Sequence, residues 1–281
     1  MPRTRSGLYV AGAECIVILI VHREGGQPME SRSRYADWPD AVVDGERGPR
    51  GLEKAFDILP PSNGTDNVQS VCRYGASWLV FHHGSVMQEY SDTGDLVREV
   101  IVEGDLLHPN DCAVGVDEVI VCDAGEDVPV LKRVDPVAAR VKERLPIEIP
   151  GWRLASVAVD EDGGILTVAA EDIPLGDRRR VLVNRYDAAG RELIQSFTVP
   201  SVHTYSQGCT VAGSFLYLNA NDGVAAEEAR ITVVDLRSTK RVDTLHVRRF
   251  GETEGLDALW IGREPYLVTA LRRAAYLVSA R

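Results

Sequence analysis

The stretch Asn110-Asp111-Cys112-Ala113-Val114, followed by Gly115 and then by Val119-Ile120-Val121-Cys122, carries the pattern that predicts the fold. Polar residues open a short apolar strand, a glycine marks a turn, and a second apolar strand follows. Two strands joined by a glycine-containing turn are typical of a β-hairpin. The stretch therefore predicts an antiparallel pair of strands, the first of which begins with polar side chains.

The same order of features occurs five times after residue 65. The other four copies occupy residues 68–81, 155–168, 207–218 and 256–268. Aligning the copies gives one column, which we call the repeat column: Ser70, Asp111, Ser156, Gly208 and Asp257, at steps of 41, 45, 52 and 49 residues. A period of this length is typical of the four-stranded blades of a β-propeller.

Outer strands are predicted after the second, third and fourth copies. They are residues 130–134 and 143–149, 181–186 and 193–199, and 231–236 and 241–247. After the fifth copy only 275–279 remains, so we expect residues 55–59 to supply the missing strand and to close the ring. The sequence therefore predicts an all-β, five-bladed propeller over residues 54–281. A six-bladed alternative requires residues 8–50 to form a blade.

The composition excludes several classes of protein. The chain has 281 residues, a hydrophobic fraction of 44%, a charged fraction of 26% and a net charge of −11. These values exclude a disordered, collagen-like or polytopic membrane protein. The acidic balance argues against nucleic acid as a partner. Five cysteines without a CxxC pair exclude a complete disulfide framework and disfavour a zinc ribbon.

Residues 1–53 are predicted to be an apolar segment followed by a polar arm. Arg3 and Arg5 precede the apolar stretch 8–21, as in a signal peptide, but Glu14 interrupts the stretch and no cleavage site follows. The stretch is short for a membrane span. A signal or anchor, a buried strand or helix, and a mis-assigned start codon stay open. We expect no firm membrane association, and a cytoplasmic location is favoured slightly over export.

The fold nominates one face for chemistry. In a propeller the beginnings of the inner strands and the loops after the second strands open on the same face, and ligands commonly bind there. His83 and Arg153 lie on this predicted face. The ligand-binding candidates on it are Gln69, His82, Asn110, Asp123, Trp152, His203, Tyr205, Gln207 and Asn219.

A second set of residues on this face has the chemistry of general acids and bases. These catalytic candidates are His108, Asp111, Glu254 and Asp257. A channel-lining carboxylate needs a hydrogen-bond partner, solvent or a metal. Asp111 and Asp257, with the amides of Gln69, Asn110 and Gln207, are oxygen ligands suited to a divalent cation in the central channel. A water-filled channel with structural carboxylates is the alternative.

Three segments carry a family resemblance. Residues 108–111, 206–208 and 254–257 are similar to motifs of uncharacterised bacterial propeller proteins. Gln207-Gly208 and Glu254-Gly255-Leu256 also resemble plant-type glutaminyl cyclases, which are five-bladed propellers. That resemblance implies a carboxylate that acts in proton transfer.

Two functions from different classes follow. The first is a binding propeller whose channel mouth takes a polar small molecule, a glycan or a peptide. The second is a propeller enzyme, a hydrolase, lyase or glutaminyl-cyclase-like protein that uses the carboxylates and a histidine. An interaction surface on the outer strands is a third possibility. We expect a monomer and no nucleic-acid partner.

Overall fold

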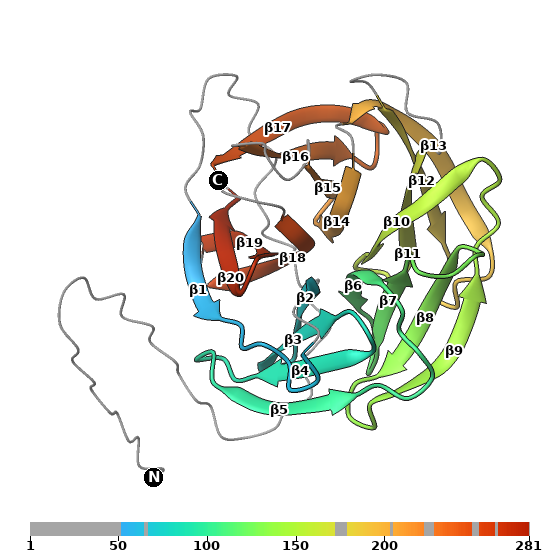
Figure 1. Ribbon diagram of the computed structural model, residues 1–281. Coiled ribbons are helices and arrows are strands. Elements are labelled where there is room, and N and C mark those ends of the chain that lie inside the picture. The colour runs from blue at the N-terminus through green and yellow to red at the C-terminus, as the bar shows by residue number, and fades with distance from the viewer. Residues whose placement is uncertain are drawn as a thin grey trace, which may run out of the picture. The chain divides into compact units, whose positions relative to one another are not determined.

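The computed structural model describes residues 52–64, 67–171, 179–202, 205–221, 228–248, 253–261 and 264–280. Five antiparallel sheets of four strands each are arranged in a ring (Figure 1). The chain is therefore a five-bladed β-propeller, as the repeat predicts, and the six-bladed alternative is wrong. No helix in the described ranges is long and apolar enough to cross a membrane. The predicted N-terminal arm lies, up to residue 51, outside the described residues.

Each blade runs from an inner strand at the channel to an outer strand at the rim. Blade one is β2 (Val68–Tyr74), β3 (Ser77–His82), β4 (Val86–Tyr90) and β5 (Leu96–Ile101). Blade two is β6 (Pro109–Val114), β7 (Val119–Asp123), β8 (Val130–Asp135) and β9 (Arg140–Pro146). Blade three is β10 (Trp152–Val159), β11 (Ile165–Glu171), β12 (Arg179–Tyr186) and β13 (Leu193–Val202). Blade four is β14 (Tyr205–Ala212), β15 (Phe215–Asn221), β16 (Glu228–Asp235) and β17 (Lys240–Arg248).

Blade five combines the two ends of the described chain. Its strands are β18 (Thr253–Ile261), β19 (Glu264–Leu271), β20 (Ala274–Ser279) and, at the rim, β1 (Glu53–Asp57). β1 pairs with β20 in antiparallel register, with Glu53 opposite Leu277. Phe56 then packs into blade one, where its ring lies 5.6 Å from Trp78 and 5.0 Å from Tyr90. The predicted closure by the N-terminal strand is confirmed.

Two predicted strands are shifted along the chain. The strand predicted over 143–149 is Arg140–Pro146, and the one predicted over 55–59 is Glu53–Asp57. In both cases the chain buries apolar side chains after the strand has ended, Ile147 and Ile149 in one and Ile58 in the other. Apolar character therefore continues past the hydrogen-bonded ladder, and the sequence pattern follows burial instead of pairing.

The hydrophobic core is divided into layers between the blades. Each of five buried clusters draws its side chains mainly from two adjacent blades, and every one of the five interfaces has such a cluster. The blade-two to blade-three layer, for example, joins Leu131 and Leu145 to Leu154 and Ile165. Burial of these faces holds neighbouring sheets together and leaves the inner strands to line the centre.

The closure of the ring gives a testable stability prediction. The fully buried Tyr90 hydroxyl accepts a hydrogen bond from the Leu59 N–H at 2.8 Å and donates one to Gln88 at 2.8 Å. Tyr90→Phe should lower the free energy of unfolding by about 1–2 kcal/mol, measured by urea titration, because both partners lose a hydrogen bond. Tyr74→Phe is the control, since no hydrogen bond from the Tyr74 hydroxyl is found in the described part. Equal stability of the two variants would contradict the role of this link.

Candidate functional site

The propeller has two faces, which we name by the inner strands. The top face is where the inner strands begin, and the bottom face is where they end. The register of each hairpin places the first residue of the inner strand opposite the end of the second strand: Val68 with His82, Pro109 with Asp123, Trp152 with Glu171, Tyr205 with Asn221 and Thr253 with Leu271. The predicted site residues therefore come from one end of every blade.

A β-bulge occurs in all five inner strands beside the repeat column. The register shifts lie between Val68 and Ser70, Pro109 and Asp111, Leu154 and Ser156, Ser206 and Gly208, and Glu254 and Asp257. A bulge re-aims the residues next to it and bends the strand. The column found in the sequence is thus the level at which each inner strand changes direction near the channel.

Asp111 lies at the centre of this level and is fully buried. Its Oδ2 atom accepts hydrogen bonds from the backbone N–H of Val157 at 3.1 Å and of Cys209 at 2.9 Å, in blades three and four. An inner strand has no neighbour on its channel side, so such N–H groups need another acceptor. Its inner strand β6 also contacts β14 and β18, which belong to blades that are not its neighbours. Asp111 therefore joins three blades through its side chain.

The protonation of Asp111 is governed by burial. Loss of solvent raises the pKa of this carboxyl well above its usual range, and the N–H groups of Cys209 and Val157 oppose that shift. The N–H groups of Cys112 and Leu256 also favour the ionised form of Asp111, although neither makes a hydrogen bond of good geometry to its Oδ1 atom. The carboxyl group is therefore an acceptor for the backbone at the centre of the ring.

Glycines bring two inner strands into contact beside Asp111. A Cβ atom added to Gly208 would lie 2.3 Å from the carbonyl carbon of Gly255 and 2.4 Å from the nitrogen of Leu256. Gly255 has a φ of +65°, and a Cβ atom there would lie 2.9 Å from the nitrogen of Val71. The inner strands of blades four, five and one therefore touch through their backbones.

Polar links join every pair of neighbouring blades near the same level. They are Ser70 Oγ to Pro109 O at 3.0 Å, Asn110 Nδ2 to Ala155 O at 2.6 Å, Ser156 Oγ to Ser206 Oγ at 2.8 Å, Asn219 Nδ2 to Gly255 O at 3.4 Å, and Arg73 N to Asp257 Oδ2 at 2.8 Å. Asp257 also accepts the N–H of Ala258 at 2.8 Å. Asn110, Asn219 and Asp257 thus connect blades.

Asp123 fixes the loop that leads into blade two. Its oxygens accept the N–H groups of Leu107 at 2.9 Å and His108 at 2.8 Å, and the buried Lys132 ammonium donates to it at 2.7 Å. Burial raises the pKa of Asp123, but Lys132 and the N–H groups outweigh it and lower the pKa below its usual value. Glu126 Oε1 forms a second ion pair with Lys132 Nζ, at 2.6 Å. Asp123 therefore positions the backbone of Leu107 and His108, and its role in ligand binding stays a prediction.

His82 is buried within blade one. Its Nε2 atom lies 2.9 Å from Gln88 Oε1, and Gln88 donates to Glu99 at 2.8 Å. Glu99 in turn accepts the backbone N–H of Ser62 at 2.9 Å. This chain of polar groups reaches from the top of blade one to the segment that follows β1, so it holds the closure of the ring.

A different group of side chains faces solvent at the top. His83 and His108 form an edge-to-face pair with ring centroids 4.3 Å apart. His83 Nδ1 bonds the Leu107 carbonyl at 3.0 Å, and His108 Nε2 lies 3.2 Å from Asn110 Oδ1. Burial, followed by the charges of His83 and Arg153, lowers the pKa of His108 below its usual value although Asn110 opposes this. The exposed Arg153 makes no hydrogen bond or ion pair with the described residues.

The remaining candidates are placed as follows. Trp152 is half-buried, with the Arg180 guanidinium 6.0 Å from its ring centre, and Gln69 is buried with its amide on the Val68 carbonyl at 3.1 Å. Gln207 and Glu254 are half-buried on the top side of the repeat column. His203 and the side chain of Tyr205 lie outside the described residues.

The predicted cation in the channel stays untested. Within the described ranges, no group of three or more His, Cys, Asp or Glu side chains is placed to hold a metal ion.

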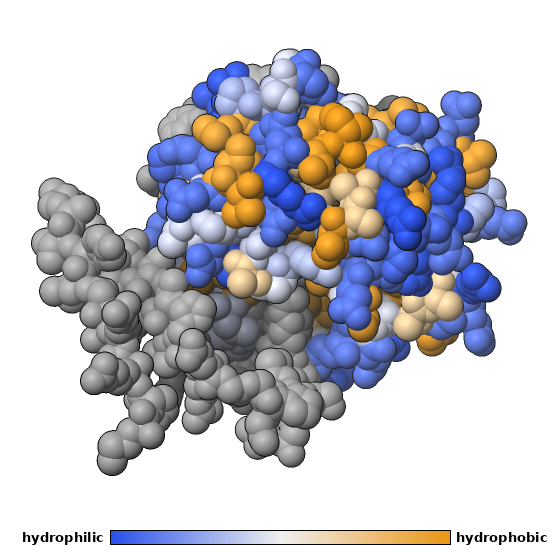
Figure 2. All heavy atoms as spheres, turned by 90° about the horizontal axis from the view of Figure 1, so that it is seen from below, coloured by the Kyte–Doolittle hydropathy of each residue, from blue (hydrophilic) through white to orange (hydrophobic). Residues whose placement is uncertain are grey.

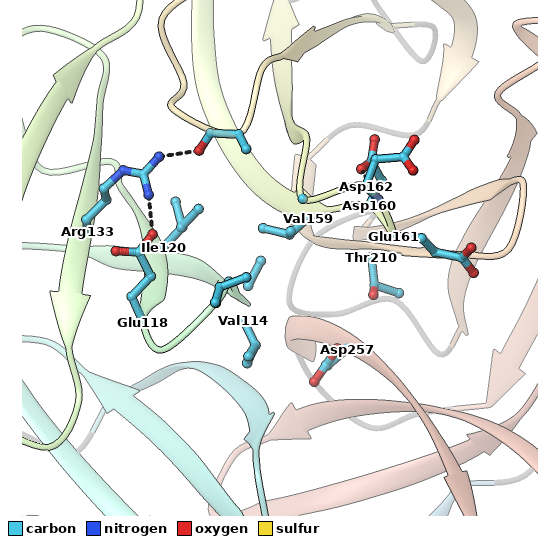
Figure 3. A pocket seen from close by; sticks show the side chains of 15 residues that line it. Val114, Glu118, Ile120, Arg133, Val159, Asp160, Glu161, Asp162, Thr210 and Asp257 are labelled. Atoms are coloured by element: carbon cyan, nitrogen blue, oxygen red, sulfur yellow. Dashed lines mark hydrogen bonds and ion pairs between the residues drawn. The ribbon is translucent and has the colours of Figure 1, made fainter. Parts of the chain in front are cut away.

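The bottom face has a cavity of about 400 Å³ that is lined by residues of blades two, three, four and five (Figure 3). Its apolar lining includes Val114, Ile120 and Val159. Its polar lining includes Glu118, Arg133, Asp160, Glu161, Asp162, Thr210 and Asp257. Of the predicted site residues that the structure describes, only Asp257 lines this cavity, which the sequence pattern did not predict.

Two polar positions were not singled out although the sequence holds a signal for each. Lys132 interrupts the apolar strand β8, and Thr210 stands among apolar neighbours in β14. A polar residue at an inward position of a strand needs a partner or faces a cavity. Lys132 meets the first condition through Asp123, and Thr210 meets the second.

The outer strands show scattered apolar exposure. On β5 of blade one, Leu96, Val97 and Ile101 are exposed. Figure 2, which views the rim from the side of this blade, shows apolar residues interrupted by hydrophilic ones. Single exposed apolar residues are ordinary on protein surfaces, and an interaction surface on the outer strands stays a prediction.

Comparisons with known proteins find likeness in structure alone. The sequence matches no described protein family and no curated protein. Hydrazine synthase of Kuenenia stuttgartiensis is similar over 79% of this chain and 55% of its own, with 15% identity and a TM-score of 0.42. The Dos1 propeller is similar over 78% of this chain and 73% of its own, with 10% identity and a TM-score of 0.43. The resemblance to glutaminyl cyclases stays a prediction.

Proposed function

We propose that this chain is a non-catalytic binding propeller that takes a polar ligand at the mouth of its top face. The observation that carries the proposal is that three predicted site carboxylates accept hydrogen bonds from the protein itself. Asp111 and Asp257 accept backbone N–H groups of the inner strands, and Asp123 accepts two loop N–H groups and Lys132. A general acid or base needs a proton position open to substrate, and toward the top face these three groups are engaged in holding the fold.

The ligand class follows from the groups that face solvent at the top. Arg153 presents hydrogen-bond donors, and the His83–His108 pair presents imidazole nitrogens beside it. Trp152 offers an aromatic surface for stacking. These side chains suit a polar small molecule, a glycan or a peptide segment that carries hydrogen-bond acceptors. Sites for such ligands typically combine a small number of well-positioned polar groups with an aromatic surface.

A thermal-shift screen of the full chain tests this proposal. The probes are monosaccharides, oligosaccharides, small carboxylic acids and short peptides. A ligand at a hundred times its Kd should raise the Tm of the wild type by roughly 5–10 °C, because binding stabilises the folded state.

Two variants locate the site. Arg153→Ala should abolish most of that shift, whereas Arg191→Ala, which removes an exposed arginine at the rim, should retain it. No shift with any probe, or an equal shift in both variants, would overturn the proposal. Turnover of a bound probe would favour the enzyme alternative.

A further inference from the structure

We infer that the cavity on the bottom face binds a linear aliphatic amine, with its ammonium group at Thr210 and Asp257 and its alkyl chain along Val114, Ile120 and Val159. This site is separate from the proposed ligand site, which lies at the opposite end of the inner strands. The cavity, its charge and one hydroxyl group that borders it, unpaired within the described residues, support this assignment.

The cavity has the size and the mixed lining of a small-molecule site. Its volume of about 400 Å³ lies within the range of ligand pockets. In Figure 3 the apolar residues Val114 and Ile120 come from blade two, and the acidic residues 160–162 come from the β10–β11 turn of blade three. An elongated ligand with an apolar stem and a charged end can contact both the apolar and the acidic parts of the lining.

The charge of the lining favours a cation. Among the described residues, five acidic side chains line the cavity against one basic side chain, Arg133. Glu118 pairs with Arg133 and lies 3.6 Å from Lys142, and Asp160 pairs with Arg185 at 2.6 Å. The acids therefore still outnumber the bases by two, and Glu161 makes no hydrogen bond or ion pair with the described residues. A concave site with excess negative charge concentrates cations.

Thr210 supplies an independent indication of a ligand. The residue is 94% buried, yet within the described residues its hydroxyl makes no hydrogen bond, and it lines the cavity. The hydroxyl borders the cavity, so a ligand or water there can supply the hydrogen bond that the described residues do not. Asp257, from the neighbouring blade, lines the same cavity and is held in place by the N–H groups of Arg73 and Ala258.

An organic cation fits these groups better than a metal ion. The described residues offer no cluster of three or more metal-ligating side chains, and half of the cavity wall is apolar. An ammonium group needs few acceptors and carries an alkyl chain that the apolar wall can bury.

Calorimetric titration of the full chain with n-pentylamine tests the inference. 1-Pentanol, which has the same length and no charge, is the matched control ligand. Pentylamine should bind with a stoichiometry of one and should bind more weakly as salt is added, and pentanol should give no binding signal at the same concentrations. Failure of pentylamine to bind, or equal binding of pentanol, would overturn the inference.

Variants locate the amine. Thr210→Val, which keeps the shape, should raise the Kd about tenfold through one lost hydrogen bond to a charged group. Glu161→Gln should raise it roughly twofold to threefold through the weaker field. Asp92→Asn removes an exposed acid of blade one and should leave the Kd unchanged. An unchanged Kd in both Thr210→Val and Glu161→Gln would place the amine elsewhere and refute the assignment.

Discussion

Asp111→Ala should lower the free energy of unfolding by about 2–4 kcal/mol, because it leaves the buried N–H groups of Val157 and Cys209 without their acceptor. Asp111→Asn keeps an oxygen at this position and should cost less than about 1.5 kcal/mol. The measurement is urea unfolding of both variants at pH 7. Two variants that lose the same stability would show that the acceptor does not matter.

The stability of wild type relative to Asp111→Asn should depend on pH in a defined direction. Burial raises the folded-state pKa of Asp111 well above its unfolded value, so the folded protein holds this proton more tightly. The resulting stability is fully present below the unfolded pKa of about 4 and is lost as pH rises through the folded pKa. Wild type should therefore lose stability relative to Asp111→Asn as pH rises above 4. Carboxyls with a lowered pKa, such as Asp123, act in the opposite direction but equally in both proteins. If the stability of wild type relative to Asp111→Asn stayed constant or rose with pH, this assignment would be contradicted.

Gly208→Ala should destabilise the protein by about 3 kcal/mol or more. The added methyl group would meet the backbone of Gly255 and Leu256 at 2.3 and 2.4 Å, and backbone atoms of a neighbouring inner strand cannot rotate away as a side chain does. Gly151→Ala is the control: its φ is +77° and nothing lies within 4 Å of its Cβ position, so only conformational strain of about 1–2 kcal/mol is expected. Thermal unfolding compares the two. Equal effects would mean that the inner strands can separate at Gly208.

The repeat made the fold predictable because each blade buries the same alternation of apolar side chains. The column from Ser70 to Asp257 was found from spacing, and the bulges beside it explain why polar residues recur there. The bulges themselves were not predictable, since a register shift is a property of two paired strands and not of one sequence segment.

The role of Asp111 was out of reach for a related reason. The N–H groups that it accepts lie 46 and 98 residues away along the chain. Its polar character in an apolar repeat indicated a special position, and its carboxyl group predicted a role in catalysis or in metal binding. Whether Asp111 acts in catalysis, in metal binding or in holding the blades together depends on three blades, and these meet only in the folded ring.

The pairing of β1 with β20 also sets an order on biosynthesis. β1 is translated before blades one to four, and its hydrogen-bonded neighbour in blade five is the last strand described. More than two hundred residues separate the two, so at 5–20 residues per second the first strand waits roughly 10–40 s on the ribosome for its partner. During that time no paired strand holds Phe56 in place against Trp78 and Tyr90. Nascent chains interrupted within blade four therefore carry an unpaired edge and an uncovered aromatic surface, which are the features that chaperones and proteases of the cell act upon.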